Sequence, residues 1–254
     1  MKKIAFNKNI YIKVVAVAVW LVIWQVVAML ISNKLMLASP VQTVSALIKM
    51  SAEGAFWKSI FGSFYHIALG FLLAVTVGVA LSVLAYKVRY VKEFLAPAVT
   101  TLNTVPVASF IVLLLISLRS KENLSTIICF MMSLPIVYAN TLAGLRATDN
   151  KMLEMARVFR VSRGKKLAYL YVYETLPSFT TGAKIALGLC WKSGVAAELI
   201  GLVQNTIGNE LYYAKLYLTM DRVFAWTVVI VAVSLAFELL VLGALRLVKR
   251  GLER

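Results

Sequence analysis

Six runs of apolar residues follow one another along the chain, separated by shorter segments that hold most of the charged residues. A helix needs about 20 apolar residues to cross the roughly 30 Å of hydrocarbon in a bilayer, and each run is of about that length or longer. The runs cover residues 14–31, 67–86, 94–118, 124–145, 176–203 and 223–245. The pattern therefore predicts an all-α membrane protein in which a single domain, residues 1–254, contains six transmembrane helices.

The composition supports a location in the bilayer. The 254 residues are 61% hydrophobic and 15% charged, and the mean hydropathy of +0.84 is higher than a soluble domain of this size requires. The first run is longer than the apolar core of a signal peptide, and similar runs follow it, so we expect a retained span. The run 176–203 carries Lys184, Lys192 and Glu198, which indicates a helix that faces a protein interior or a wet cavity.

The basic residues predict the orientation. If the loops alternate between the two sides and the N-terminus lies inside, 18 of the 27 Lys and Arg residues fall on the inner side and 7 on the outer side. Positive residues favour the cytoplasmic side, so we expect both termini and the segment 146–175 in the cytoplasm. The net charge of +16 does not indicate nucleic-acid binding, because the basic residues flank apolar runs.

Small residues recur every four positions in two of the runs. They are Gly70, Ala74, Gly78 and Ser82 in the run 67–86, and Gly182, Ala186, Cys190 and Gly194 in the run 176–203. Each series lies along one helix face, where it lets a neighbouring backbone approach closely. We expect these two faces to be helix-packing surfaces.

The segment 146–175 is the longest polar stretch between two apolar runs. Thr148 or Asp149 can cap a helix there. One face of that helix is apolar, with residues at offsets of three, four and seven, and the opposite face is charged. The apolar face holds Met152, Met155, Ala156 and Phe159, and the charged face holds Glu154, Arg157 and Arg160. Such a helix needs a cover, which helix ends of the same chain, anionic lipid or a soluble partner can provide.

This segment, "LEMARVFRVSRGKKLAYLYVYETLP", resembles the EAA loop of binding-protein-dependent ABC importer permeases. The loop's pattern is Glu-Ala-Ala, three residues, Gly, nine residues, a hydrophobic residue, one more, and Leu-Pro. Glu154 and Ala156 match the first and third positions, Met155 replaces the central Ala, and Arg160 replaces the Gly. A Leu-Pro at Leu176 follows, as in the nitrate, sulfonate and taurine branch of the family.

The resemblance extends from residue 37 onward. It includes "LASPVQTVSAL", "LGFLLAVTVGVALS", "NTVPV", "LAGLRATDNKMLEMA", "GAKIALGLCWKSGVAAELIG" and "VFAWTVVIV". It implies the fold of a type I ABC importer permease in a bacterial-type plasma (inner) membrane, with a cytoplasmic coupling helix in the segment 146–175. The implied partners are cytoplasmic ABC ATPase subunits, an extracytoplasmic solute-binding protein, a second permease copy in a homodimer, and membrane lipid.

The residues also indicate a transport subunit without an enzymatic activity of its own. The sequence contains no GxxxxGK followed by Ser or Thr, the loop in which a protein cradles the phosphates of ATP. ATP hydrolysis is therefore expected on a partner. Cys129 and Cys190 lie inside apolar runs as small packing residues, and with His66 they do not form a set at metal-ligand spacing. We expect no metal and no cofactor.

A candidate translocation path follows from the resemblance and from the polar residues in the spans. It includes Pro106, Ser109, Trp191, Lys192 and Glu198. Lys192 can line the path of an anionic solute, or it can pair with a backbone carbonyl or with Glu198 of another subunit. The solute can be a sulfonate, nitrate, taurine or a pyrimidine precursor. The competing interpretation is a proton-coupled secondary transporter that uses Lys192 and Glu198 as a charge relay.

Overall fold

The computed structural model describes residues 2–31 and 37–252, and its regular structure within those ranges is entirely helical. Residues 1, 32–36 and 253–254, which include Lys34 and Arg254 of the orientation count, lie outside the described residues. The elements are α1 (Lys2–Ile31), α2 (Pro40–Ser51), α3 (Gly54–Lys87), α4 (Arg89–Thr104), α5 (Val107–Ser117), α6 (Leu124–Arg146), α7 (Asn150–Val158), α8 (Arg163–Lys166), the π-helix η1 (Leu167–Val172), α9 (Tyr173–Gly201), α10 (Ile207–Leu216) and α11 (Met220–Leu252).

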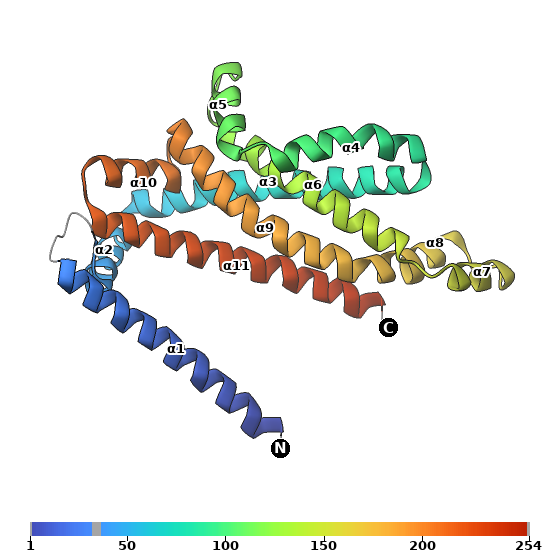
Figure 1. Ribbon diagram of the computed structural model, residues 1–254, viewed down its shortest axis with the longest axis horizontal. Coiled ribbons are helices and arrows are strands. Elements are labelled where there is room, and N and C mark those ends of the chain that lie inside the picture. The colour runs from blue at the N-terminus through green and yellow to red at the C-terminus, as the bar shows by residue number, and fades with distance from the viewer. Residues whose placement is uncertain (1, 32–36, 253–254) are drawn as a thin grey trace.

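Helix α6 packs against both α3 and α9, and these three helices form the centre of the molecule (Figure 1). Glycines permit this close approach. A Cβ atom added to Gly70 of α3 would lie 2.5 Å from the Thr126 carbonyl oxygen of α6, and one added to Gly194 of α9 would lie 2.7 Å from the Cys129 sulfur. The small-residue faces predicted from the sequence are therefore the surfaces on which these helices meet.

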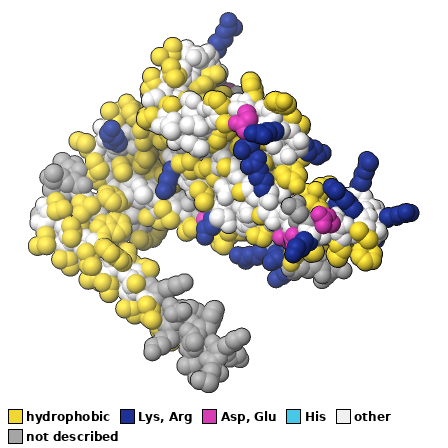
Figure 2. Space-filling model, turned by 45° about the vertical axis from the view of Figure 1, so that its right-hand side comes forward, with side chains coloured by type: hydrophobic (Ala, Val, Ile, Leu, Met, Phe, Trp, Pro, Cys, Tyr) yellow, Lys and Arg dark blue, Asp and Glu magenta, His cyan; other side chains and the backbone are white. Residues whose placement is uncertain are grey.

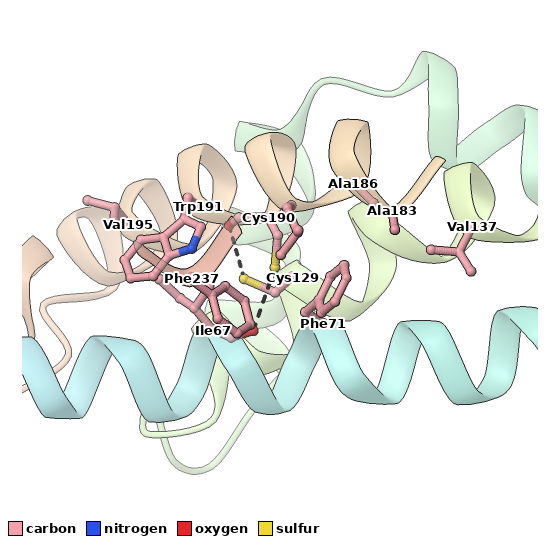
Figure 3. Close-up of a cluster of buried hydrophobic side chains, with 11 residues drawn as sticks. Ile67, Phe71, Cys129, Val137, Ala183, Ala186, Cys190, Trp191, Val195 and Phe237 are labelled. Atoms are coloured by element: carbon pink, nitrogen blue, oxygen red, sulfur yellow. Dashed lines mark hydrogen bonds between the residues drawn. The ribbon is translucent and has the colours of Figure 1, made fainter. Parts of the chain in front are cut away.

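Side chains from α3, α6, α9 and α11 fill the main hydrophobic core (Figure 3). The two cysteines lie at its centre. The Cys129 thiol donates to the Cys190 carbonyl oxygen at 3.2 Å, and the Cys190 thiol donates to the Ile67 carbonyl oxygen at 3.6 Å. Both thiols are buried and free, so they serve as small packing residues that also satisfy backbone carbonyls inside the membrane.

Four helices among the described residues are long and apolar enough to cross a membrane. They are α3, α6, α11 and the part of α1 from Val14 to Ile31. The pair α4 and α5 makes a fifth crossing if the two are counted together. Helix α9 contains most of the predicted span 176–203 and has 29 residues. The prediction of a multi-pass helical membrane protein is confirmed, whereas six crossings remain a prediction.

The predicted span 94–118 is not one straight helix. The chain breaks between α4 and α5, and the two helices meet at a bend of 102°. Val105 is extended there, with φ −74° and ψ 131°, and Pro106 follows it. A proline disfavours the helical conformation of the residue before it and has no N–H to donate. The proline therefore weakens the helix at this point, and the tertiary structure turns the break into a sharp corner.

Helix α1 extends away from the other helices (Figure 1). None of the side chains from Val14 to Ile31 is buried. Its contacts lie toward its C-terminal end, where the Trp24 indole N–H donates to the Ala38 carbonyl oxygen at 3.1 Å and the Trp24 ring lies 5.4 Å from the Phe224 ring. An apolar helix this exposed requires lipid or another protein around it.

Two short helices outside the spans, α2 and α10, lie at the same end of the molecule (Figure 1). Ser39 caps α2 in a capping box, because its hydroxyl accepts from the Gln42 N–H at 3.3 Å while the Gln42 side chain accepts from the Ser39 N–H at 3.0 Å. Thr206 caps α10 by accepting from the Asn209 N–H at 3.3 Å. These caps fix where both helices begin.

Candidate functional site

The basic segment between α6 and α9 contains α7, α8 and η1 and lies at the end of the molecule away from α2 and α10 (Figure 1). Figure 2 shows Lys and Arg side chains gathered around this end. The Asp149 carboxylate caps α7 by accepting from the Lys151 N–H at 2.9 Å. The sequence offered Thr148 or Asp149 as the cap, and the structure selects Asp149.

The apolar face predicted for this helix is largely exposed. Met152 is 42% exposed, Met155 50% and Phe159 74%, whereas Ala156 is only 4% exposed. Ala156 therefore packs inside its own chain and is not on the surface offered to a partner, in contrast to the expected position of this residue. Val158, which the sequence analysis did not single out, is 79% exposed and enlarges the apolar surface.

The charged residues predicted on the other face are also at the surface. Glu154, Arg157 and Arg160 are all exposed, and the ion pairs found among the described residues involve none of them. The exposed part of α7 thus combines an uncovered apolar surface with charges that have no partner carboxylate or cation within salt-bridge distance in this part of the chain. This combination is typical of a protein-binding surface.

Arg160, which replaces the Gly of the family pattern, lies in the turn after α7. Arg160 has a φ of 49°, in the left-handed region that glycine adopts without strain. The Val161 N–H donates to the Ala156 carbonyl and the Arg160 N–H donates to the Arg157 carbonyl, both at 3.0 Å. These two bonds are the Schellman pattern of a helix end. The chain therefore keeps the turn geometry that the glycine would favour, with a residue that adopts it at some cost.

Helix α8 continues through η1 into α9, because the residues at both junctions, Lys166 and Val172, are helical. The wide turns of η1 end where the Tyr173 N–H meets the Ala168 carbonyl five residues earlier. Tyr171 of η1 packs against Tyr86 of α3, with ring centroids 5.9 Å apart. Helices α8, η1 and α9 are thus one continuous rod, so a displacement of α8 would act directly on α9.

Three predicted path residues on α9 point in different directions. Lys192 is exposed, whereas Trp191 is 2% exposed and lies in the core cluster (Figure 3). The centroid of its ring is 6.5 Å from that of Phe64. Glu198 has no exposed surface. Among the described residues no ion pair joins Lys192 to Glu198. In this protomer Lys192 can therefore face a path or a partner directly, while Trp191 and Glu198 lie behind that surface.

Glu198 connects three helices at the end of the molecule near α10. Its Oε2 atom accepts from the Ser63 hydroxyl of α3 at 2.6 Å and from the Gly208 N–H of α10 at 3.2 Å. The Ser63 hydroxyl in turn accepts from the Ile207 N–H at 2.8 Å. Gly208 has no room for a side chain, because a Cβ there would lie 2.4 Å from the Cβ of Glu198. The carboxylate therefore fastens the start of α10 to the bundle.

The other two predicted path residues lie at the corner between α4 and α5. Pro106 and Ser109 are both exposed. Helix α5 is attached to the bundle by Ile111, which is fully buried in a cluster with residues of α6 and α9, whereas α4 buries none of its side chains. The α5 side of the corner is thus packed more tightly than the α4 side, where Val91, Leu95 and Val99 are only partly buried.

The structure also reveals an ion pair that the sequence analysis missed. The Lys184 Nζ atom of α9 lies 3.4 Å from the Glu238 Oε1 atom of α11, and the two side chains are 63% and 24% exposed. The sequence analysis placed Lys184 in the run 176–203 without assigning it a partner. Nothing in the spacing of the two residues could have indicated that α9 and α11 lie side by side.

A second charged group joins the helices at the α10 end. The Arg222 Nη2 atom lies 3.6 Å from the Glu53 Oε1 atom, and both side chains are about half exposed. Partial burial raises the pKa of the Glu210 carboxyl above its usual value, while the Arg222 guanidinium lowers it and the Glu53 carboxylate raises it. The ion pair joins the beginnings of α3 and α11, and its two charges act on the Glu210 carboxyl of α10.

Comparisons with known proteins place these features in context. Residues 67–254 match the sequence profile of a family described as binding-protein-dependent transport system inner membrane component. The chain is 28% identical over 218 residues to SsuC of Bacillus subtilis, a protein named as an aliphatic sulfonates transport permease. That match covers 85% of this chain and 79% of the relative.

A second relative is the nitrate import permease protein NrtB of Synechocystis, which is 27% identical over 237 residues and matches over 84% of this chain and 86% of its own length. Among solved structures, an amino acid ABC transporter crystallised with histidines is similar in fold. The TM-score is 0.53 at 17% sequence identity, and the similar region covers 76% of this chain and 93% of the solved chain.

Proposed function

Because the chain belongs to the family of binding-protein-dependent transport system inner membrane components, we propose that it is the membrane-spanning subunit of an ATP-driven importer for a small anionic solute. A solute-binding protein would deliver the solute on the outer side, and a separate ATPase would supply the energy. The helical fold and the relatives that carry sulfonate and nitrate in their names support this proposal. The uncovered surface of α7 is the observation that carries it.

The ATPase would bind α7 through Met152, Met155 and Phe159, with Glu154, Arg157 and Arg160 around them. These apolar side chains are exposed on a helix that also carries charges without partners in the described chain, so a protein groove would cover them at little cost. Since α8, η1 and α9 form one rod, closure of the ATPase would be transmitted to the centre of the bundle. Ala156 would act from inside, by holding α7 against its own chain.

The experiment changes the surface of α7 and leaves Ala156 in place. In the variant Glu154→Arg with Met155→Asp, one charge is reversed and another is placed without a partner in the proposed contact, which costs about 3 kcal/mol or more once buried. We expect the ATPase subunit to be lost when the permease is purified from membranes and ATP-driven uptake to fall to background. Neither residue lies in a span, so the amount of permease in the membrane should be unchanged.

A matched control carries the same two kinds of charge change elsewhere in the segment. Glu174→Arg with Ser162→Asp alters the net charge equally at exposed positions outside the apolar face. This control should retain the ATPase and the uptake. Full ATP-dependent transport by the α7 variant would overturn the coupling role. Uptake that continues after ATP depletion but is abolished by an uncoupler would favour a proton-coupled carrier.

The solute would pass along the surface that carries Lys192, Pro106 and Ser109. These three residues are exposed although they belong to apolar segments, and a lysine at that depth is suited to attract an anion. Trp191 and Glu198 would support the surface from behind, because both are buried. The path role of all five residues is part of the proposal.

Assembly as two permease copies follows from the same surface. In a single copy Lys192, Pro106 and Ser109 are exposed, so a second copy is needed to enclose a channel around them. No side chain of α1 between Val14 and Ile31 is buried. Lipid and that copy would cover this helix. Both termini and the α7 end would lie in the cytoplasm, as the excess of basic residues there favours.

A further inference from the structure

A cavity of about 400 Å³ lies between α4 and α6, apart from the residues discussed above. Lys92 in the first turn of α4 and Arg146 at the end of α6 stand at one end of it. Val99 and Ala139 line it seven residues away from these cations along their helices, which is about 10 Å. The cavity is therefore a groove with a basic mouth and an apolar wall.

The charge at the mouth of the α4–α6 groove is uncompensated. No acidic residue lines the groove. Neither Lys92 nor Arg146 takes part in the ion pairs found in the described ranges, which join Lys184 to Glu238 and Arg222 to Glu53. Two cations that line the same groove without a carboxylate favour an anionic ligand with several oxygen acceptors.

The wall of the groove decides which anion fits. Ala96, Val99, Ala139 and Leu142 offer apolar surface, and the hydroxyl of Thr100 is already bonded to the Ala96 carbonyl at 2.9 Å. A free inorganic anion would make no use of this wall, whereas each methylene of an acyl chain buried against it adds to binding. Helix α4 buries no side chain of its own, so a bound chain would also cover it.

We propose that the α4–α6 groove binds an anionic phospholipid of the inner leaflet. Lys92 and Arg146 hold the phosphate group, and an acyl chain lies along Val99, Ala139 and Leu142. The assignment to the inner leaflet rests on the orientation given under Proposed function, because α4 begins and α6 ends on the side of the basic segment. Basic pockets between transmembrane helices on the cytoplasmic side are suited to such headgroups.

The test compares retention of phosphatidylglycerol and phosphatidylcholine by the purified full-length permease, measured by native mass spectrometry. The wild-type protein should retain phosphatidylglycerol in preference. In Lys92→Gln with Arg146→Gln that preference should fall roughly twenty-five-fold, because each cation removed lowers it about fivefold. The matched control, Lys87→Gln with Arg89→Gln, removes two exposed cations at the same end outside the groove and should keep the preference.

A third variant tests the apolar wall. Ala139→Trp fills the groove and leaves both cations, and since Ala139 is exposed, the fold should tolerate it. Loss of phosphatidylglycerol in this variant is the expected result. Equal retention of phosphatidylglycerol by the charge variant and its control would overturn the proposal, as would retention of this lipid by Ala139→Trp. The proposal would also be overturned if inorganic phosphate displaced the lipid, or if the variants lost the dimer in the same spectra. These readings do not depend on transport, so they are separate from the coupling experiment.

Discussion

Two carboxylates at opposite ends of the molecule make the same local contact. Glu198 accepts from the Gly208 N–H at 3.2 Å, and Asp149 accepts from the Lys151 N–H at 2.9 Å. Each N–H belongs to the second residue of a short helix, α10 in the first case and α7 in the second. The surroundings differ, because Glu198 has no exposed surface while Asp149 is exposed.

The difference lies in where each carboxylate comes from. Glu198 belongs to α9 and also accepts from Ser63 of α3 at 2.6 Å, so α10 is fastened by residues far away in the sequence. Asp149 is the residue next to α7, and its bond is local. The α10 end is therefore part of the core, whereas α7 can loosen without disturbing the bundle. That is the property expected of a surface that must follow a moving partner.

The largest effect should come from the buried carboxylate. Glu198→Ala leaves the Gly208 N–H and the Ser63 hydroxyl without their acceptor, and each unsatisfied buried group costs about 1–3 kcal/mol. We expect a loss of about 2–4 kcal/mol in the free energy of unfolding, seen as a lower melting temperature of the purified permease. Glu198→Gln keeps an acceptor oxygen in place and should lose much less. Equal melting temperatures for the two variants would contradict the proposed network.

A smaller effect is expected from the exposed carboxylate. Asp149→Ala removes an N-cap, which costs about 1 kcal/mol, and the loss should be confined to α7. Hydrogen exchange of the α7 amides should become faster while the melting temperature of the bundle stays close to that of the wild type. If the melting temperature fell as far as in Glu198→Ala, the two ends would not differ in the way described.

The helices themselves could largely be predicted from the sequence, because the length of an apolar run and a capping residue are local properties. The runs around Val14–Ile31, α3, α6 and α11 correspond to helices, and Ser39, a residue type that favours N-caps, caps α2. The corner at Pro106 could be predicted only in part. A proline weakens a helix locally, but the 102° bend also depends on how Ile111 and its neighbours pack α5 onto the bundle.

The candidate site was harder to predict because it depends on which side of a helix its neighbours cover. Ala156 shares a helix face with Met152 and Met155 in the sequence pattern, yet it alone of the three is buried. Lys192 and Glu198 were both treated as polar residues of one span, but only Lys192 is exposed. The partner of Lys184, Glu238, lies 54 positions away, on a helix whose rotation no local pattern determines.

The smallest effect concerns the ends of two helices that stop on a left-handed residue other than glycine. Arg160 follows α7 with φ 49°, and Leu202 follows α9 with φ 53°. Glycine relieves about 1–2 kcal/mol of strain at such a position. It also gives the unfolded chain more conformational freedom, which lowers the free energy of unfolding by about 0.5–1 kcal/mol. For Arg160→Gly we therefore expect a net gain of about 0.5 kcal/mol, measured as slower hydrogen exchange in α7 with an unchanged melting temperature.

For Leu202→Gly a gain of similar size should appear in the melting temperature. The turn at Leu202 is part of the fastened end, because the Val203 N–H donates to the Glu198 carbonyl at 3.1 Å. A gain that appeared in the melting temperature for both variants would mean that α7 unfolds together with the bundle, and the contrast between the two ends would be lost.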